Sequence, residues 1–152
     1  MAPPRLLAVA TFAPDETKST SDHELLFTRP VHLTALRVVP ANFKPHPREM
    51  PAFAGATPPT RLQIEFFAAE RGVDTVARPM LSRPHLHAPD QYAAELIPVP
   101  ESAARHRSDY VVVRTDSITV SLCFYGVEAA PSRPPVTPPG WRTLPSFWHM
   151  DG

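Results

Sequence analysis

Hydrophobic residues along much of this chain recur with a period of two, the spacing of a β-strand with one buried face. The pattern is clearest at 61–66, where Leu62, Ile64 and Phe66 alternate with polar or charged residues. The segment 118–125 alternates in the same way, and 109–114 is rich in valine, which favours strands. We therefore expect β-strands at these three places.

A short polar sequence at 115–117 separates the last two of these segments. Because Thr-Asp-Ser suits a turn, the pattern predicts that 109–114 and 118–125 form a β-hairpin. Cys123 falls on the opposite face from Ile118 and Phe124, which predicts partial exposure of its thiol.

The other expected elements are shorter or less regular. Strands are expected at 6–12, at 24–27, at 31–39 and within 73–80, with loops at 15–22, 40–59 and 83–89. The alternation changes phase at Ala35, which predicts a bulge, and Arg29–Pro30 is expected to separate two strands. Residues 92–99 suit either a helical turn or a strand, and 102–107 suits one turn of helix.

Proline is the unusual feature of the composition, with 21 residues against 5 glycines. Each proline removes a backbone donor and fixes φ, so a chain this rich in proline is not largely helical. Many short strands joined by proline-rich connections predict an all-β sandwich or barrel. We place this domain at 1–128, followed by a proline-rich tail at 129–152 that ends in an aromatic cluster.

Charge and cysteine content narrow the class of protein. Lys plus Arg and Asp plus Glu both number 15, so the balance argues against a nucleic-acid binder that works through an overall basic surface. Cys123 is the single cysteine, which excludes an internal disulfide. No apolar run approaches the length of a membrane span, and no signal sequence is evident, so we expect a cytosolic or nuclear protein.

Three groups of residues are candidates for catalysis or metal binding. His85 and His87 could share a metal on one strand face, with His106 or Asp90 as further ligands, although an exposed loop is the favoured interpretation. Cys123 could be a nucleophile, but a small hydrophobic residue without a catalytic role is favoured. The carboxylates that could pair as in a glycosidase are Glu65, Glu70, Asp90, Glu95 and Asp109, and solvated surface is favoured for them. We therefore expect no catalytic residue, cofactor or metal.

Partner binding is the remaining class of function. A basic rim for a partner or for weak RNA contact could form around the long proline-rich loop from Arg37, Lys44, His46, Arg48 and Arg61. Of these we select Arg37, Lys44 and Arg61. Trp141 and Trp148 lie in the tail and either fold back on the domain or bind a partner. These five residues are the candidate partner-binding residues, although a packed loop with solvated charges is the favoured interpretation of the first three.

The order of several segments resembles the N-terminal domain of virilizer proteins. The similar segments are Leu6–Phe12, Glu24–Val31, Leu36–Pro40, Lys44–His46, Ala54–Pro58, Arg61–Phe67, Ser108–Arg114 and Leu122–Gly126. Together they cover about residues 5–126, and the most distinctive sequences among them are Arg-Val-Val-Pro and Phe-Tyr-Gly.

Virilizers are large scaffold subunits of the messenger-RNA N6-adenosine methyltransferase complex, and they continue into a long helical-repeat region. The resemblance implies a jelly-roll β-sandwich similar to galactose-binding-like domains. It also implies a nuclear, non-catalytic protein-interaction domain whose partners are protein subunits of that complex, with no membrane partner and no small-molecule substrate. A carbohydrate-binding β-sandwich is the alternative, for which Phe43, Phe53 and Tyr92 are the candidate aromatic platforms.

Overall fold

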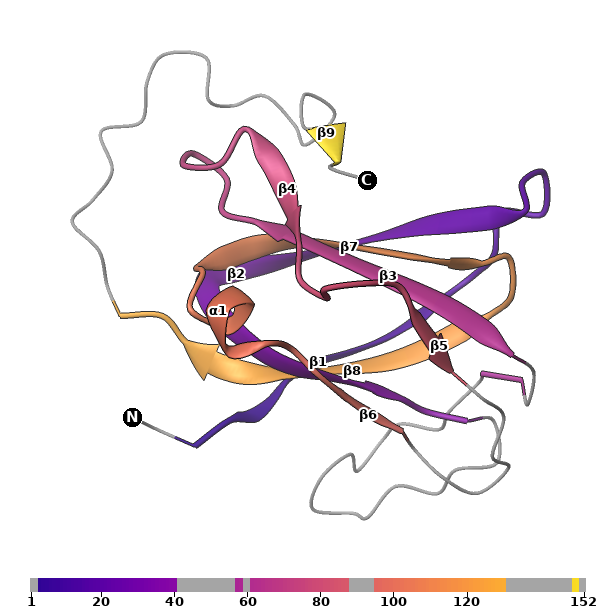
Figure 1. Ribbon diagram of the computed structural model, residues 1–152, viewed down its shortest axis with the longest axis horizontal. Coiled ribbons are helices and arrows are strands. Elements are labelled where there is room, and N and C mark those ends of the chain that lie inside the picture. Colours follow the sequence, from indigo (N-terminus) through magenta and orange to yellow (C-terminus); the bar gives the residue numbers. More distant parts are fainter. Residues whose placement is uncertain (1–2, 41–56, 59–60, 88–94, 131–148, 151–152) are drawn as a thin grey trace.

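Strands make up most of the chain in the computed structural model, which describes residues 3–40, 57–58, 61–87, 95–130 and 149–150 (Figure 1). The strands are β1 (Arg5–Phe12), β2 (Thr20–Val38), β3 (Leu62–Ala69), β4 (Val76–Pro79), β5 (His85–His87), β6 (Leu96–Pro98), β7 (Ser108–Asp116), β8 (Val120–Glu128) and β9 (His149–Met150). A single short helix, α1 (Glu101–Ala104), lies between β6 and β7. The prediction of a mostly β protein with almost no helix is confirmed.

Strand β2 is the strand around which the sheet is organised. Its first part, 20–26, pairs antiparallel with β7, and its second part, 31–38, pairs antiparallel with β8. On the β7 side the sheet continues through β3 to β4 and β5, and on the β8 side β1 pairs with β8 and β6 with β2. Figure 1 shows β3 and β7 running together across one side of the molecule and β1 and β8 across the other. The sheet is therefore folded so that its two sides share β2.

One hydrophobic core joins the two sides. Leu36 of β2 and Phe124 of β8 belong to the same buried cluster as Ile64 and Phe66 of β3 and Val113 of β7. The ring centroids of Phe66 and Phe124 are 6.3 Å apart, so side chains from opposite sides of the fold pack directly on each other. The alternation at 61–66 and 118–125 supplies these inward side chains, as predicted.

The predicted hairpin of 109–114 and 118–125 is wrong. Both strands exist, as β7 and β8, but β2 lies between them in the order of the sheet. The connection passes from the β7 side to the β8 side, and the Ser117 amide donates to the carbonyl of Ser19, just before β2. The short connection indicated two consecutive antiparallel strands, but β7 and β8 each pair with a different part of β2.

The prediction of separate strands at 24–27 and 31–39 is also wrong, because β2 is continuous across Arg29–Pro30. Its pairing with β7 shifts register between Leu26 and Val31, so the proline lies where regular pairing is interrupted. A second shift lies between Leu33 and Ala35 in the pairing with β8, which confirms the bulge predicted near Ala35.

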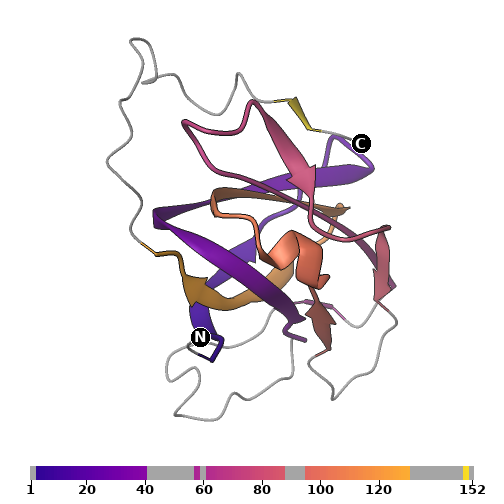
Figure 2. The same ribbon diagram turned by 60° about the vertical axis from the view of Figure 1, so that its left-hand side comes forward.

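The least regular part of the sequence holds β5, β6 and α1. Residues 83–89 were expected to be a loop, yet β5 pairs with β3 through His87–Leu62 and His85–Ile64. Residues 96–98 form strand β6 rather than a helical turn, and the expected turn of helix is α1. In Figure 2, β6 and α1 lie between the second part of β2 and the β4–β5 segment.

At the far edge β9 pairs in parallel with β4. No helix among the described residues is long and apolar enough to cross a membrane.

Candidate functional site

The segment Leu81–Pro84, which connects β4 to β5, forms a ridge beside the edge of β3. Its start is fixed by Met80, whose side chain is buried and whose amide donates to the Phe66 carbonyl at 2.8 Å. Its end is fixed where His85 pairs with Ile64. Because both ends are held by β3, the four residues between them are held away from the strand edge.

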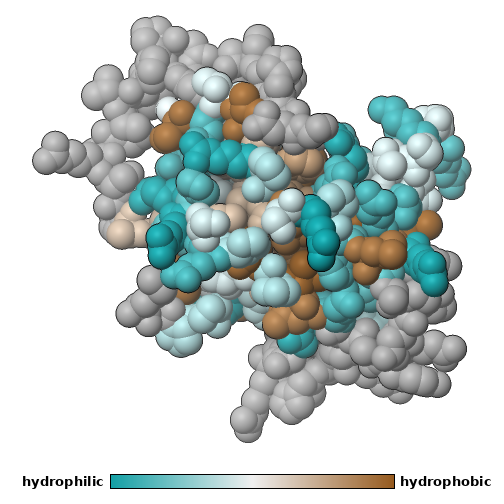
Figure 3. Space-filling view, viewed as in Figure 1, coloured by the Kyte–Doolittle hydropathy of each residue, from teal (hydrophilic) through white to brown (hydrophobic). Residues whose placement is uncertain are grey.

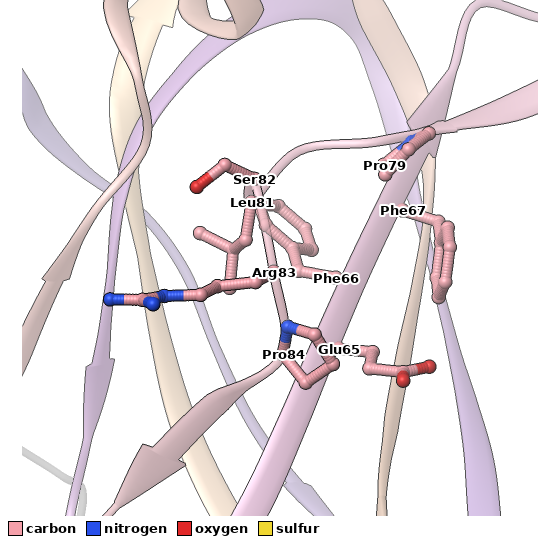
Figure 4. A pocket seen from close by; sticks show the side chains of 8 residues that line it. All are labelled: Glu65, Phe66, Phe67, Pro79, Leu81, Ser82, Arg83 and Pro84. Atoms are coloured by element: carbon pink, nitrogen blue, oxygen red, sulfur yellow. The ribbon is translucent and has the colours of Figure 1, made fainter. Parts of the chain in front are cut away.

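A groove lies on each side of this ridge. The first has a volume of about 380 Å³ and lies against β3, where Glu65, Phe66 and Phe67 line it (Figure 4). The second has a volume of about 590 Å³. It lies between the ridge and β5 on one side and Ile97, Pro98 and Pro100 on the other. This second groove, which we call the β5–β6 groove, lies where β5, from the β7 side of the fold, faces β6, from the β8 side.

Six of the nine residues that line the β5–β6 groove are leucine, isoleucine or proline. Leu81 packs against the main core, and Ile97 is buried within it, so the base of the groove is hydrophobic. Leu86 lies at the rim with 59% of its surface exposed. Figure 3 shows hydrophobic surface over β5 and β6, bordered by hydrophilic side chains. A leucine this exposed beside an apolar depression is typical of a contact surface.

Three side chains tie the two walls of this groove together, and we call them the His–Glu clasp: His85, His87 and Glu95. The two imidazoles are on one face of β5, as their i, i+2 spacing predicts. His85 Nε2 and His87 Nδ1 both hydrogen-bond to Glu95 Oε1, the second at 3.2 Å. A carboxylate only accepts hydrogen bonds, so each of these nitrogens carries a hydrogen. Since the carbonyl of Glu95 accepts from the Val38 amide, the clasp joins β5 to the strand pair of β6 and β2.

Electrostatics keep the Glu95 carboxyl ionised. Partial burial by itself raises its pKa, but the hydrogen bonds from His85 and His87 outweigh burial and hold the pKa below its usual value. His87 is buried, so the predicted exposed loop at these histidines is wrong. Both nitrogens point at the same carboxylate oxygen, and no group of three or more His, Cys, Asp or Glu among the described residues is arranged to hold a metal ion.

The structure describes only some of the residues that were predicted to bind a partner. Arg37 lies on β2 with its guanidinium 5.5 Å from the centre of the Tyr125 ring, and its buried Nε has no hydrogen-bond partner among the described residues. Arg61 is exposed and immediately precedes β3. Lys44, Trp141 and Trp148 lie outside the described residues. Of the predicted basic rim the structure therefore places two members, and no hydrogen bond in the described part of the chain joins them. The aromatic platforms Phe43, Phe53 and Tyr92 also lie outside it.

The carboxylates weighed for a glycosidase pair with basic side chains instead. Glu65 binds Arg114, Glu70 binds Arg107 and Asp109 binds Arg71, each with an N···O distance of 3.3 Å. His106, the other metal-ligand candidate, contacts Arg78, and Asp90 lies outside the described residues.

Cys123 was expected to be partly exposed, and this is wrong. It is fully buried in a small cluster with Val39, Leu6, Val9 and Tyr125, on the face of β8 away from the main core. Sequence parity identified the correct face, but β1 and the residues after β2 give that face its own apolar neighbours.

Sequence reasoning noted His85, His87 and Glu95 but did not bring them together. Their association depends on β5 pairing with β3 and β6 pairing with β2, two pairings that local patterns do not reveal. It missed the ridge and Leu86 entirely. A possible signal was the HLH sequence between prolines, because two histidines flanking a leucine fit a short edge strand with one polar face.

We compared the chain with known proteins, and no protein-family model, curated protein or solved structure matches it.

Proposed function

We propose that this chain is a non-catalytic protein-interaction domain of the virilizer N-terminal type, acting in the nucleus with subunits of the messenger-RNA N6-adenosine methyltransferase complex. The observation that carries the binding function is the β5–β6 groove, with its apolar base and the exposed Leu86 at its rim. The choice of complex rests on the sequence resemblance across about residues 5–126.

The proposal also includes a more specific fold, the jelly-roll sandwich. A single core between two sides that share β2 is compatible with a jelly-roll sandwich similar to galactose-binding-like domains. In such a fold the free strand edges and connecting loops are the places left for a ligand. The β5–β6 groove has this position, because β5 and β6 each pair with a neighbour on one edge in the described structure.

A protein partner suits the groove better than a small polar ligand. Its lining is mainly leucine, isoleucine and proline, and binding energy at protein interfaces is concentrated where apolar side chains are desolvated together. The lining also includes Arg83, Ser82 and His85, which can supply polar contacts around this apolar centre.

Co-purification from nuclear extract tests the proposal. The tagged full chain is expressed in cells that contain the methyltransferase complex, beside Leu86→Glu and the matched control Val73→Glu. Val73 lies in the turn after β3 and is 66% exposed, so its substitution adds the same charge on a comparably exposed site.

We expect the wild-type chain and Val73→Glu to recover methyltransferase subunits, and Leu86→Glu to recover at least about fivefold less, as for a residue worth about 1 kcal/mol. If no subunit is recovered with the wild type, the proposed complex is wrong. If Leu86→Glu recovers as much as the wild type, the groove is not the binding site.

A further inference from the structure

Arg83 is the one charged side chain of the ridge. The side chain is exposed, and Arg83 forms no ion pair within the described residues. It lines both grooves. An arginine in this position presents five hydrogen-bond donors to whatever occupies the groove.

Two carboxylates among the described residues near the grooves already have hydrogen-bond partners. Glu65 lines the first groove but binds Arg114, and Figure 4 shows its carboxylate pointing away from the Arg83 guanidinium. Glu95 is bound by both histidines of the clasp. Each of these carboxylates would lose established hydrogen bonds by turning to Arg83, so neither of these two is available to the guanidinium.

Strand β6 limits how a ligand can use the groove. Glu95 and Val99 direct their backbone groups toward β2, because the Val38 amide donates to Glu95 and the Val99 amide donates to Thr34. The alternation of a strand then directs the backbone of Leu96 and Pro98 to the free edge, where proline has no N–H to donate. A regular added strand is disfavoured there, so recognition at this wall depends on side chains.

We propose that the β5–β6 groove binds an extended acidic peptide segment, with a carboxylate paired to Arg83 and a flanking apolar side chain against Leu81, Leu86 and Ile97. This assignment rests on the proposed protein-interaction function and names the chemistry of the partner. The positive charge of Arg83 favours an acidic residue in the peptide, and the apolar base of the groove favours a hydrophobic residue beside it. The clasp positions the two walls and leaves Arg83 as the charged group that determines specificity.

The test uses the full chain, labelled with ¹⁵N, and two peptides with blocked ends. The acidic probe is acetyl-Pro-Leu-Glu-Leu-Pro-amide, and the matched probe replaces its glutamate with glutamine. Amide chemical shifts of Leu86 and Ile97 report the place of binding, and their titration gives the dissociation constants. We expect the acidic probe to bind about three- to tenfold more tightly at low ionic strength, with the difference shrinking as salt is added.

Arg83→Gln is the deciding variant, and Arg29→Gln is its control. Arg29 is also exposed and has no ion pair within the described residues, but it lies on β2 and outside both grooves. We expect Arg83→Gln to retain the wild-type spectrum outside the groove and to bind both probes equally, whereas Arg29→Gln keeps the preference for the acidic probe.

The other outcomes overturn the inference in distinguishable ways. If both probes shift the groove amides equally in the wild type, the acidic preference is wrong while the protein-interaction function stands. If neither probe shifts them, the groove is not an acidic-peptide site, and the Leu86→Glu co-purification decides the proposed function separately. If an oligouridylate shifts the same amides and the acidic probe does not compete with it, Arg83 serves RNA and the peptide assignment is wrong.

Discussion

At the scale of single residues, Gly126 shows how closely the strands of the β8 side approach each other. A Cβ at this position would lie 2.1 Å from the backbone carbonyl oxygen of His32 on β2. Because the neighbouring atom belongs to the backbone of β2, no side-chain rotation can relieve this contact. The glycine of the Phe-Tyr-Gly sequence is therefore required by the pairing of β8 with β2.

We predict that Gly126→Ala lowers the free energy of unfolding by about 2 kcal/mol or more, because β2 and β8 must separate locally to admit the methyl group. Gly72→Ala is the comparison. Gly72 has a φ of 91° and nothing within 4 Å of an added Cβ, so its cost is conformational and about 1 kcal/mol. Urea unfolding measures both, and a smaller loss for Gly126→Ala than for Gly72→Ala would contradict the close approach.

The His–Glu clasp makes a second prediction at this scale, which concerns pH. The pKa of Glu95 is lower in the folded chain than its ordinary value of 4.5, so the folded state binds fewer protons around that pH. The stability gained from this difference is present above about pH 4.5 and is lost as the pH falls through the folded pKa. Glu95→Gln removes this part of the acid dependence and, by weakening the hydrogen bonds, costs about 1 kcal/mol near neutral pH.

Unfolding free energies measured from acid to neutral pH test the clasp, with Glu128→Gln as the control. Glu128 pairs with Arg5, and more than half of each side chain is exposed, so its loss changes little. Equal effects of the two substitutions across the pH range would show that the clasp does not hold Glu95.

At the scale of elements, Arg114 of β7 links three strands on the face of the sheet away from the main core. Its Nε donates to Asp22 of β2 at 2.8 Å, and its Nη1 donates to Glu65 of β3 at 3.3 Å. The guanidinium also lies 5.5 Å from the centre of the Phe67 ring. Several partners for one half-buried cation make this more than an isolated surface pair.

We predict that Arg114→Met lowers the free energy of unfolding by about 1 kcal/mol, because it leaves two carboxylates without their donor while retaining most of the apolar contact with Phe67. Arg105→Met is the control, since Arg105 and Glu101 form a largely exposed pair on α1, for which we expect little change. The comparison requires only thermal or urea unfolding of the two variants. Indistinguishable stabilities would exclude Arg114 as a link between strands.

The elements also show how far sequence reasoning reaches. Alternation at 61–66 and 118–125 predicted β3 and β8 because one buried face leaves a local periodic signal. The pairing of strands with one another leaves no comparable signal in the sequence. The hairpin of β7 and β8 was inferred from their short connection, whereas β2 pairs with both strands. Strand β5 has only three residues, too few for alternation to show, and its identity comes from its pairing with β3.

The candidate site was less predictable than the fold for the same reason. Leu86 and Ile97 approach the groove from β5 and β6, which belong to opposite sides of the folded sheet. Their proximity depends on the whole path of β2 and on the core that both sides share. The basic residue that faces this groove is Arg83, whereas sequence reasoning chose Arg37 and Arg61 from their positions around the long loop.

At the scale of the whole molecule, the main core is enclosed by strands that share β2, while β5, β6 and the ridge form the edge at which we propose that a partner binds. Leu33 of β2 and Val113 of β7 are fully buried in the main core, whereas Leu86 presents most of its side chain to solvent. Binding at such an edge can proceed without rearrangement of the core. We therefore expect a partner to alter the groove and to leave the strands around Leu33 and Val113 unchanged.

Hydrogen–deuterium exchange of the full chain, alone and with the partner recovered by co-purification, tests this account most directly. We predict slower exchange on binding at 81–87 and 95–100, with no change in the turn at 70–74 or in β1. Protection confined to β1 and β8, with 81–87 and 95–100 unaffected, would contradict the central claim that the β5–β6 groove holds the partner.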